Sequence, residues 1–214
     1  METARIKLKT VLTVIASIAL IEAAAIFLTA GRNINPILII GIVRILEIFT
    51  IIAAVKPLEK SLVSIGLDLH TITGGLKKGL LWSAIFGLVT GLIFLILYFA
   101  GIDPLSLIQT KLPENKKEIL IFLIIGCFIG PVAEELFFRG VLYSFFRRWG
   151  ILAALIFTTI IFILAHHNKG TIPLTQAIGG ILFAAAYEFE KSLMVPIVIH
   201  ILGNTAIFML SFLW

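Results

Sequence analysis

Residues 118–146 read EILIFLIIGCFIGPVAEELFFRGVLYSFF, an apolar run interrupted at its centre by Glu134, Glu135 and Arg139. A helix that crosses the hydrocarbon core of a bilayer, about 30 Å thick, needs about 20 apolar residues, and this run is long enough. The whole chain has the same character, since 60% of its residues are hydrophobic and 14% are charged. Soluble domains are typically about half apolar and a quarter charged. The sequence therefore predicts an integral membrane protein.

Similar apolar blocks lie on both sides of this run, separated by turn residues and charges. Together they predict seven transmembrane helices: Leu8–Ala30, Pro36–Val55, Gly79–Ala100, Glu118–Phe146, Ile151–His166, Ile172–Tyr187 and Leu193–Leu213. The expected fold is an all-α, polytopic helix bundle that forms a single membrane domain over residues 1–214. The first block runs past Ala23–Ala25, where a signal peptide would be cleaved, so we expect it to be retained as a helix.

The net charge of +5 comes from Lys and Arg residues in the connections between apolar blocks. Positive charge there orients helices and meets anionic lipid head groups, so we expect lipid partners and no nucleic acid. The connections on the N-terminal side carry more Lys and Arg than the opposite ones. The positive-inside rule then predicts a multi-pass cell-membrane protein with a cytoplasmic N-terminus. The half-apolar connection 56–78 suits the cytoplasmic interface.

Ionisable residues inside transmembrane helices are costly, about 2.5 to 3.5 kcal/mol at mid-helix on insertion scales. A first group comprises Glu22, Arg44 and Glu47. Arg44 and Glu47 are three residues apart and share a helix face, and Glu22 can reach Arg44 from the neighbouring helix. We expect this group to be a structural ion pair.

The second group is the paired glutamates in the quoted run. Glu135 and Arg139 are four residues apart with the acid first, the favourable order for an intrahelical pair. Arg139 is therefore expected to neutralise Glu135. Glu134 points about 100° away around the helix and has no local counter-charge. A carboxylate in that position can act as a general base.

Partners for Glu134 are expected on the later helices, where Phe162 and His166 share one face and His200 and Asn204 share another. At 1.5 Å per residue from the inferred cytoplasmic ends, Glu134, His166 and His200 lie at depths of roughly 20, 22 and 14 Å. A carboxylate and an imidazole can hold and deprotonate a water, and a His and an Asn can donate hydrogen bonds to an oxyanion. This set suits peptide hydrolysis, although a membrane His or Asn also bridges helices.

Three motifs follow one another on successive apolar segments: Glu134-Glu135-x-x-x-Arg139, then Phe162-x-x-x-His166, then His200-x-x-x-Asn204. This order resembles the CAAX protease and bacteriocin-processing (CPBP, or Abi) family of intramembrane proteases. The resemblance covers roughly residues 118–208, the expected catalytic core, which follows N-terminal transmembrane helices in residues 1–117. It implies three pairs that activate the water, hold the site in shape and stabilise the oxyanion: Glu134 with His166, Glu135 with Arg139, and His200 with Asn204.

The resemblance implies an endopeptidase acting on a membrane-associated peptide, prenylated or of bacteriocin type. Glu134, His166 and His200 would also suit Zn²⁺ with an open coordination position, so metal-dependent and metal-free, glutamate-dependent hydrolysis both stay open. Two other functions stay open as well. One is a non-catalytic immunity or scaffold protein that keeps the polar network, and the other is a proton-coupled transporter, because buried Glu and His residues also form proton relays. The sequence predicts no oligomeric state.

Overall fold

The computed structural model describes residues 6–166 and 174–212. Within these residues no β-strand occurs, so the predicted all-α class is confirmed. Seven helical segments of the described chain lie where the apolar blocks predicted them: α1 (Leu8–Thr29), α2 (Pro36–Glu59), α3 (Ile72–Phe99), a broken helix over residues 116–149, α7 (Ile151–Ala165), α8 (Leu174–Glu190) and α9 (Met194–Ser211). The predicted start of the sixth helix at Ile172 and the predicted end of the seventh at Leu213 lie outside the described residues.

Five helical segments in the described part of the chain are long and apolar enough to cross a membrane, rather than the seven predicted. They are α1, α2, the segment Leu69–Phe99 that contains α3, the broken helix Lys116–Trp149, and α9. The helix α7 is apolar but shorter. Large apolar side chains such as Phe27, Leu88 and Leu152 lie exposed on the outside of the helices, as expected where lipid is the solvent.

The largest differences from the predicted helix boundaries lie at Val55 and Gly79. The helix α2 continues to Glu59, and α3 begins at Ile72 after the 3₁₀ turns Leu62–Ile65 and Leu69–Thr71. The first turns of α3 contain Gly75 and Gly79, which are poor helix formers. Both glycines face α9: a Cβ on Gly79 would lie 2.6 Å from the Cβ of Val198. Close packing of the two helices therefore outweighs the local propensity.

The broken helix consists of four helical pieces and two wider, π-helical turns. In order these are α4 (Lys116–Ile124), the π-helical η4 (Ile125–Ile129), α5 (Gly130–Glu135), the π-helical η5 (Leu136–Tyr143), α6 (Ser144–Phe146) and the 3₁₀ turn η6 (Arg147–Trp149). Pro131 accounts for the first wide turn, because in a regular helix its ring would clash with the carbonyl of Cys127. Single π turns inside helices are frequent at functional sites.

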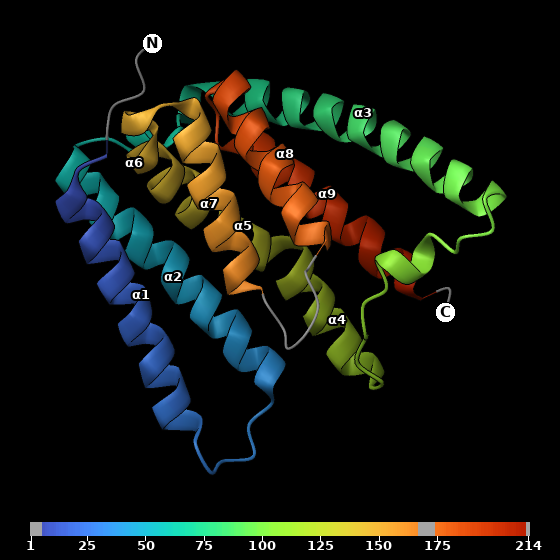
Figure 1. Ribbon diagram of the computed structural model, residues 1–214. Helices are drawn as coiled ribbons and strands as arrows, with labels where there is room; N and C mark the ends of the chain where they lie inside the picture. Colours follow the sequence, from blue (N-terminus) through green and yellow to red (C-terminus); the bar gives the residue numbers. More distant parts are fainter. Residues whose placement is uncertain (1–5, 167–173, 213–214) are drawn as a thin grey trace.

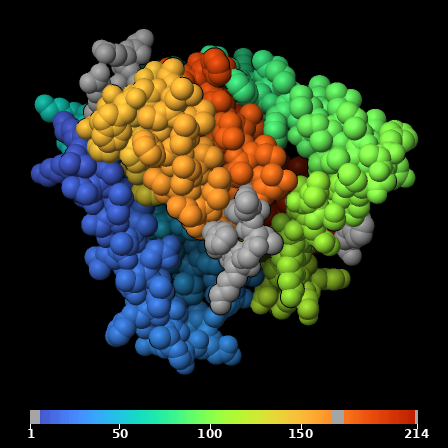
Figure 2. All heavy atoms as spheres, in the orientation of Figure 1, coloured from blue at the N-terminus to red at the C-terminus, as the bar shows by residue number. Residues whose placement is uncertain are grey.

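The broken helix lies at the centre of the molecule (Figure 1), and the buried core surrounds its η5 segment. The helices α1 and α2 lie side by side on one flank, α7 and α8 pack against each other, and α3 runs along α9. Figure 2 shows α7 and α8 on the near face, between α1 and α3. Arg139 and Tyr143 of η5 are among the largest fully buried side chains, so the centre of this apolar protein is polar.

Candidate active site

The pair Glu135 and Arg139 lies at the centre of the bundle, with both side chains 0% exposed. Arg139 Nη1 donates to Glu135 Oε1 at 2.9 Å, which confirms the predicted intrahelical pair. Arg139 Nη2 also donates to the Gly180 carbonyl of α8 at 3.3 Å. On its other side Glu135 Oε1 accepts from His200 Nδ1 of α9 at 2.8 Å. One carboxylate therefore joins the broken helix to α9, and its arginine partner joins the broken helix to α8.

Aromatic rings enclose the Arg139 guanidinium. Its central carbon lies 4.7 Å from the centroid of Phe162 and 5.1 Å from that of Phe183. Phe183 also stacks on His200, with ring centroids 4.6 Å apart and 24° between the planes. Cation–π contacts of this kind strengthen when water is excluded. The rings from α7 and α8 thus hold both the guanidinium and the imidazole in fixed orientations.

The second glutamate of the pair faces the two histidines. Glu134 Oε2 lies 3.6 Å from His166 Nε2 and 3.9 Å from His200 Nε2. These distances exceed those of direct hydrogen bonds, and polar groups at such separations are often bridged by one water. The structure therefore brings together the three residues that the depth argument predicted to meet.

The ring orientations follow from the other nitrogen of each histidine. His166 Nδ1 lies 2.8 Å from the Phe162 carbonyl oxygen, which can only accept, so Nδ1 carries a hydrogen. His200 Nδ1 faces the Glu135 carboxylate in the same way. In the neutral form of each ring, the Nε2 lone pair then points towards Glu134. The backbone carbonyl of Phe162 orients His166, a role that the side-chain pattern did not indicate.

Asn204 lies one turn after His200 on α9 and contacts the first π-helical turn. Its Nδ2 donates to the Gly126 carbonyl of η4 at 2.8 Å. A carbonyl in a wide turn is available to such a donor because the regular i→i−4 pattern is interrupted there. The amide is therefore held beside the broken helix, with one of its two hydrogens directed at Gly126.

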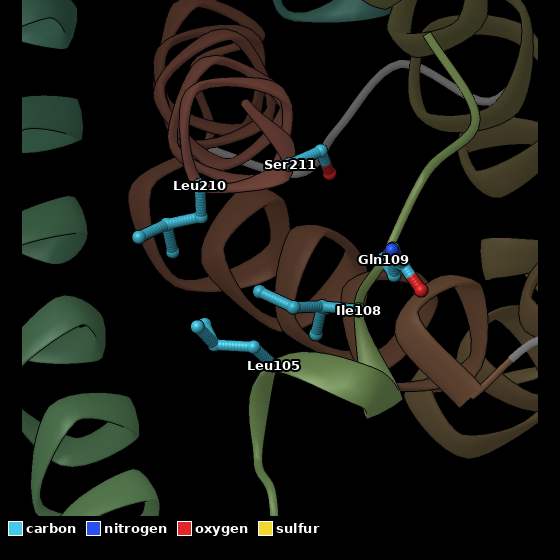
Figure 3. A pocket seen from close by; sticks show the side chains of 5 residues that line it. All are labelled: Leu105, Ile108, Gln109, Leu210 and Ser211. Atoms are coloured by element: carbon cyan, nitrogen blue, oxygen red, sulfur yellow. The ribbon is translucent and has the colours of Figure 1, made fainter. Parts of the chain in front are cut away.

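The predicted ion pair in the N-terminal helices is also present. Arg44 Nη1 bonds Glu47 Oε2 at 2.6 Å and lies 3.7 Å from Glu22 Oε1. A separate pocket at the far end of α9 has no such chemistry (Figure 3). Its lining is Leu105, Ile108, Gln109, Leu210 and Ser211, without an ionisable side chain, and it has no room for a water molecule.

Comparisons with known proteins match the part of the chain that contains this site. Residues 116–206 match the family described as type II CAAX prenyl endopeptidase Rce1-like. This segment is therefore similar to CAAX proteases. All the predicted site residues, from Glu134 to Asn204, lie inside the matched segment.

One similar protein is the membrane-embedded CAAX protease MroQ of Staphylococcus aureus (strain USA300), which is 39% identical to the chain over 101 residues. That alignment covers 44% of this chain and 40% of the relative, so the chain spans less than half the length of the relative. No solved structure matches the chain significantly.

The residues that could hold a metal are the same three, Glu134, His166 and His200. In residues 6–166 and 174–212, no three or more His, Cys, Asp or Glu side chains form a group that could hold a metal ion. Glu134, His166 and His200 approach one another without meeting that arrangement. Metal dependence therefore stays a prediction.

Two residues of the candidate site, Gly180 and Phe183 of α8, were not indicated by the sequence motifs. The pair Gly179-Gly180 in an apolar helix does indicate a close approach by another element. A Cβ on Gly180 would lie 3.0 Å from Thr159 of α7. This contact brings α8 against α7 and lets the Gly180 carbonyl reach Arg139.

Proposed function

We propose that the chain is an intramembrane endopeptidase that hydrolyses a peptide bond of a membrane-associated peptide. The observation that supports this proposal is the convergence of Glu134 Oε2 with the Nε2 atoms of His166 and His200. The convergence occurs in a segment similar to CAAX proteases, beside a fully buried ion pair. A carboxylate and an imidazole facing one point are suited to polarise a water.

In the proposed reaction, Glu134 and His166 hold the water, and Glu134 accepts its proton as the water oxygen bonds the peptide carbonyl carbon. Glu134 then returns the proton to the amine nitrogen as the C–N bond breaks. No step of this proposal involves a metal.

The negative charge that develops on the carbonyl oxygen needs donors. Asn204 has a second amide hydrogen, since Gly126 accepts only one. His200 can donate from Nε2 only as an imidazolium, because its Nδ1 hydrogen is directed at Glu135. Glu135 stabilises that cation, and Arg139 neutralises Glu135 as the ring returns to its neutral form. These two donors are the proposed oxyanion site.

The proposed substrate is a peptide carried to the site by the bilayer, with a prenylated C-terminal tail as the first candidate and a bacteriocin-type peptide as the second. The first follows from the name of the matched family, a CAAX prenyl endopeptidase. A farnesylated, internally quenched peptide and the same peptide without the lipid distinguish lipid-dependent from lipid-independent recognition.

We also propose that all seven helical segments cross the membrane, with the N-terminus in the cytoplasm. The helices α7 and α8 have 15 and 17 residues, or roughly 22 and 26 Å at 1.5 Å per residue. They reach across a core of about 30 Å when the adjoining turns contribute. Labelling of Lys77→Cys in intact cells by an impermeant maleimide would contradict this orientation.

The test of the proposed activity is hydrolysis of the farnesylated peptide by purified protein in lipid nanodiscs, with and without a zinc chelator. We expect Glu134→Ala and His166→Ala to lose about 10² to 10⁴ of the rate, the range of general acid–base catalysis. The matched controls are Glu114→Ala and His70→Ala, which change exposed residues of the same types and should retain full activity.

Undiminished hydrolysis by folded Glu134→Ala and His166→Ala proteins would contradict the proposal. Loss of activity with chelator and its return with Zn²⁺ would contradict the metal-free form of it. Absence of hydrolysis with every peptide, together with a cellular phenotype that survives Glu134→Gln, would favour the non-catalytic scaffold instead.

A further inference from the structure

Ser144 lies directly after the second wide turn, η5, which contains Arg139. Its hydroxyl donates to the Arg139 carbonyl at 3.3 Å, whereas its backbone N–H donates to the Val141 carbonyl. In a regular π-helical pattern, the backbone N–H of residue 144 would bond the carbonyl of residue 139, five positions earlier. The Ser144 side chain therefore supplies a bond at this spacing, while its backbone amide bonds elsewhere.

A second hydroxyl, from Tyr187 of α8, extends this contact. Tyr187 Oη lies 3.0 Å from Ser144 Oγ. A serine hydroxyl has one hydrogen and two lone pairs. Because the Ser144 hydrogen is directed at the Arg139 carbonyl, Tyr187 is the donor to Ser144. Both side chains are buried, where hydrogen bonds are stronger than in water. A chain of two hydrogen bonds therefore runs from Tyr187 through Ser144 to the main chain of Arg139.

Tyr187 shares its face of α8 with the residues that contact the Arg139 side chain. The Gly180 carbonyl, which accepts from Arg139 Nη2 at 3.3 Å, lies two turns before Tyr187. Phe183, whose ring centroid is 5.1 Å from the guanidinium carbon, lies between them. Residues at this spacing line one face of a helix. One face of α8 therefore holds Arg139 by its side chain and, through Ser144, by its main chain.

The ring of Tyr187 is itself fixed by packing. It meets the ring of Tyr143 edge to face, with centroids 5.6 Å apart and 89° between the planes. The backbone at Gly66 also lies against it, since a Cβ there would be 2.6 Å from a carbon of the Tyr187 ring. The Gly66 carbonyl in turn accepts from the Leu193 N–H at 2.8 Å. These contacts keep the Tyr187 hydroxyl at one position beside Ser144.

We propose that the hydroxyls of Tyr187 and Ser144 are positioning groups for the hydrolysis. They hold the main chain of Arg139 so that its guanidinium reaches Glu135 at 2.9 Å. Glu135 in turn orients His200 through the 2.8 Å contact with its Nδ1. The inference rests on the proposed function and adds two residues that lie outside the three sequence motifs. It predicts a loss in kcat with little change in KM, because both hydroxyls act through Arg139 rather than on the peptide.

The first measurement is of kcat and KM for the farnesylated peptide. We expect Ser144→Ala to lower kcat by roughly 10-fold or more, since a displacement of about 1 Å in a catalytic group can cost about 10²-fold. Tyr187→Phe should lower kcat less, because the bond from Ser144 to the Arg139 carbonyl remains. KM should stay near the wild-type value in both variants.

The matched controls remove hydroxyls of the same types that have no bond to Arg139. Ser64→Ala deletes a buried hydroxyl that donates to the Ser61 carbonyl at 2.7 Å. Tyr143→Phe deletes a hydroxyl that donates to Glu188 Oε2 at 3.1 Å, on the ring next to Tyr187. Both controls should leave kcat unchanged. A loss in Tyr143→Phe as large as that in Tyr187→Phe would overturn the inference.

A folding defect is separated by the double variant Ser144→Ala/Tyr187→Phe. Ser144→Ala alone leaves the Tyr187 hydroxyl buried without its acceptor, which is costly, whereas the double variant removes that hydroxyl as well. We expect the double variant to unfold at a higher temperature than Ser144→Ala and to be as slow. Recovery of kcat together with stability would overturn the inference, and so would wild-type kcat in Ser144→Ala.

A second measurement does not depend on hydrolysis. The chain has four histidines, so the proton NMR signals of isotope-labelled histidine are few, and His200→Gln identifies that of His200. We expect the hydrogen on His200 Nδ1, which is directed at the Glu135 carboxylate, to give a downfield signal that moves upfield in Ser144→Ala and not in Ser64→Ala. An unmoved signal in Ser144→Ala would overturn the inference. If the signal moves but the wild-type protein hydrolyses no peptide, the contacts position His200 as inferred and the proposed function alone fails.

Discussion

Arg139→Met removes one partner of an ion pair whose side chains are both 0% exposed. The change deletes the bonds to Glu135 and to the Gly180 carbonyl and leaves Glu135 with His200 as its remaining partner. Breaking a buried pair in this way costs about 3–5 kcal/mol, chiefly because an uncompensated charge stays buried. For a chain of this size, each kcal/mol lowers the unfolding temperature by roughly 2–4 °C. We therefore expect a decrease on the order of 10 °C.

The assay can use the chain's single cysteine. Cys127 is 2% exposed, so a thiol-reactive fluorophore reports the temperature at which the core around the first π-helical turn opens. The double variant Glu135→Gln/Arg139→Met removes both charges, and the amide oxygen of the introduced glutamine can still accept from His200. We expect the double variant to be more stable than Arg139→Met by about 1–3 kcal/mol, because it leaves no uncompensated buried charge.

A matched comparison is the pair Lys78 and Glu190, whose N···O distance is 2.6 Å and whose lysine side chain is 56% exposed. Lys78→Met should cost about 0–1 kcal/mol, the usual value for exposed pairs. The reasoning is refuted if Arg139→Met unfolds no earlier than Lys78→Met. It is also refuted if the loss of stability in the double variant equals the sum of the losses in Arg139→Met and in Glu135→Gln, since the two buried charges would then be independent.

Two further substitutions test the packing of the helices and the oxyanion site. Gly79→Ala should cost about 1–3 kcal/mol by overpacking, because its Cβ would lie 2.6 Å from that of Val198. Gly87→Ala, whose Cβ would have nothing within 4 Å, should be neutral or slightly stabilising. Equal temperatures of Cys127 labelling in the two variants would contradict this prediction. Asn204→Ala should lower peptide hydrolysis by about 10² to 10³, the loss seen for oxyanion donors, and unchanged kcat would remove Asn204 from the proposed oxyanion site.

The positions of the helices could be predicted because the signal is local. A run of about 20 apolar residues identifies a membrane helix without knowledge of its neighbours. The region between Lys56 and Gly79 was predicted less well because long-range contacts determine it. The Leu193 N–H donates to the Gly66 carbonyl at 2.8 Å, and a Cβ on Gly66, whose φ is +76°, would lie 2.6 Å from Tyr187. The turns after α2 are therefore shaped by the connection between α8 and α9.

The same difference between local sequence signals and long-range contacts holds within the candidate site. The pair Glu135 and Arg139 was predictable from its spacing, and counting depth was enough to bring Glu134 towards His166 and His200. The bond from His200 to Glu135 and the stacking of Phe183 on His200 depend on which helices are neighbours. No spacing along one segment contains that information. The sequence was thus enough to predict which ionisable residues meet, but not the contacts that orient them.

The adjacent glutamates differ because of what surrounds their short helix. Glu135 faces Arg139 and His200, so its charge is compensated inside the core. Glu134 faces His166, which is held by a backbone carbonyl, and among the described residues Glu134 makes no contact to that ring shorter than 3.6 Å. The wide turns on both sides of α5 contribute to this difference. A carbonyl of η4 accepts a hydrogen bond from Asn204, and η5 contains Arg139. A substitution that restored a regular helix at either wide turn would rotate the two glutamates relative to Arg139, His166 and His200. The different surroundings of Glu134 and Glu135 therefore depend on the backbone as much as on the side chains.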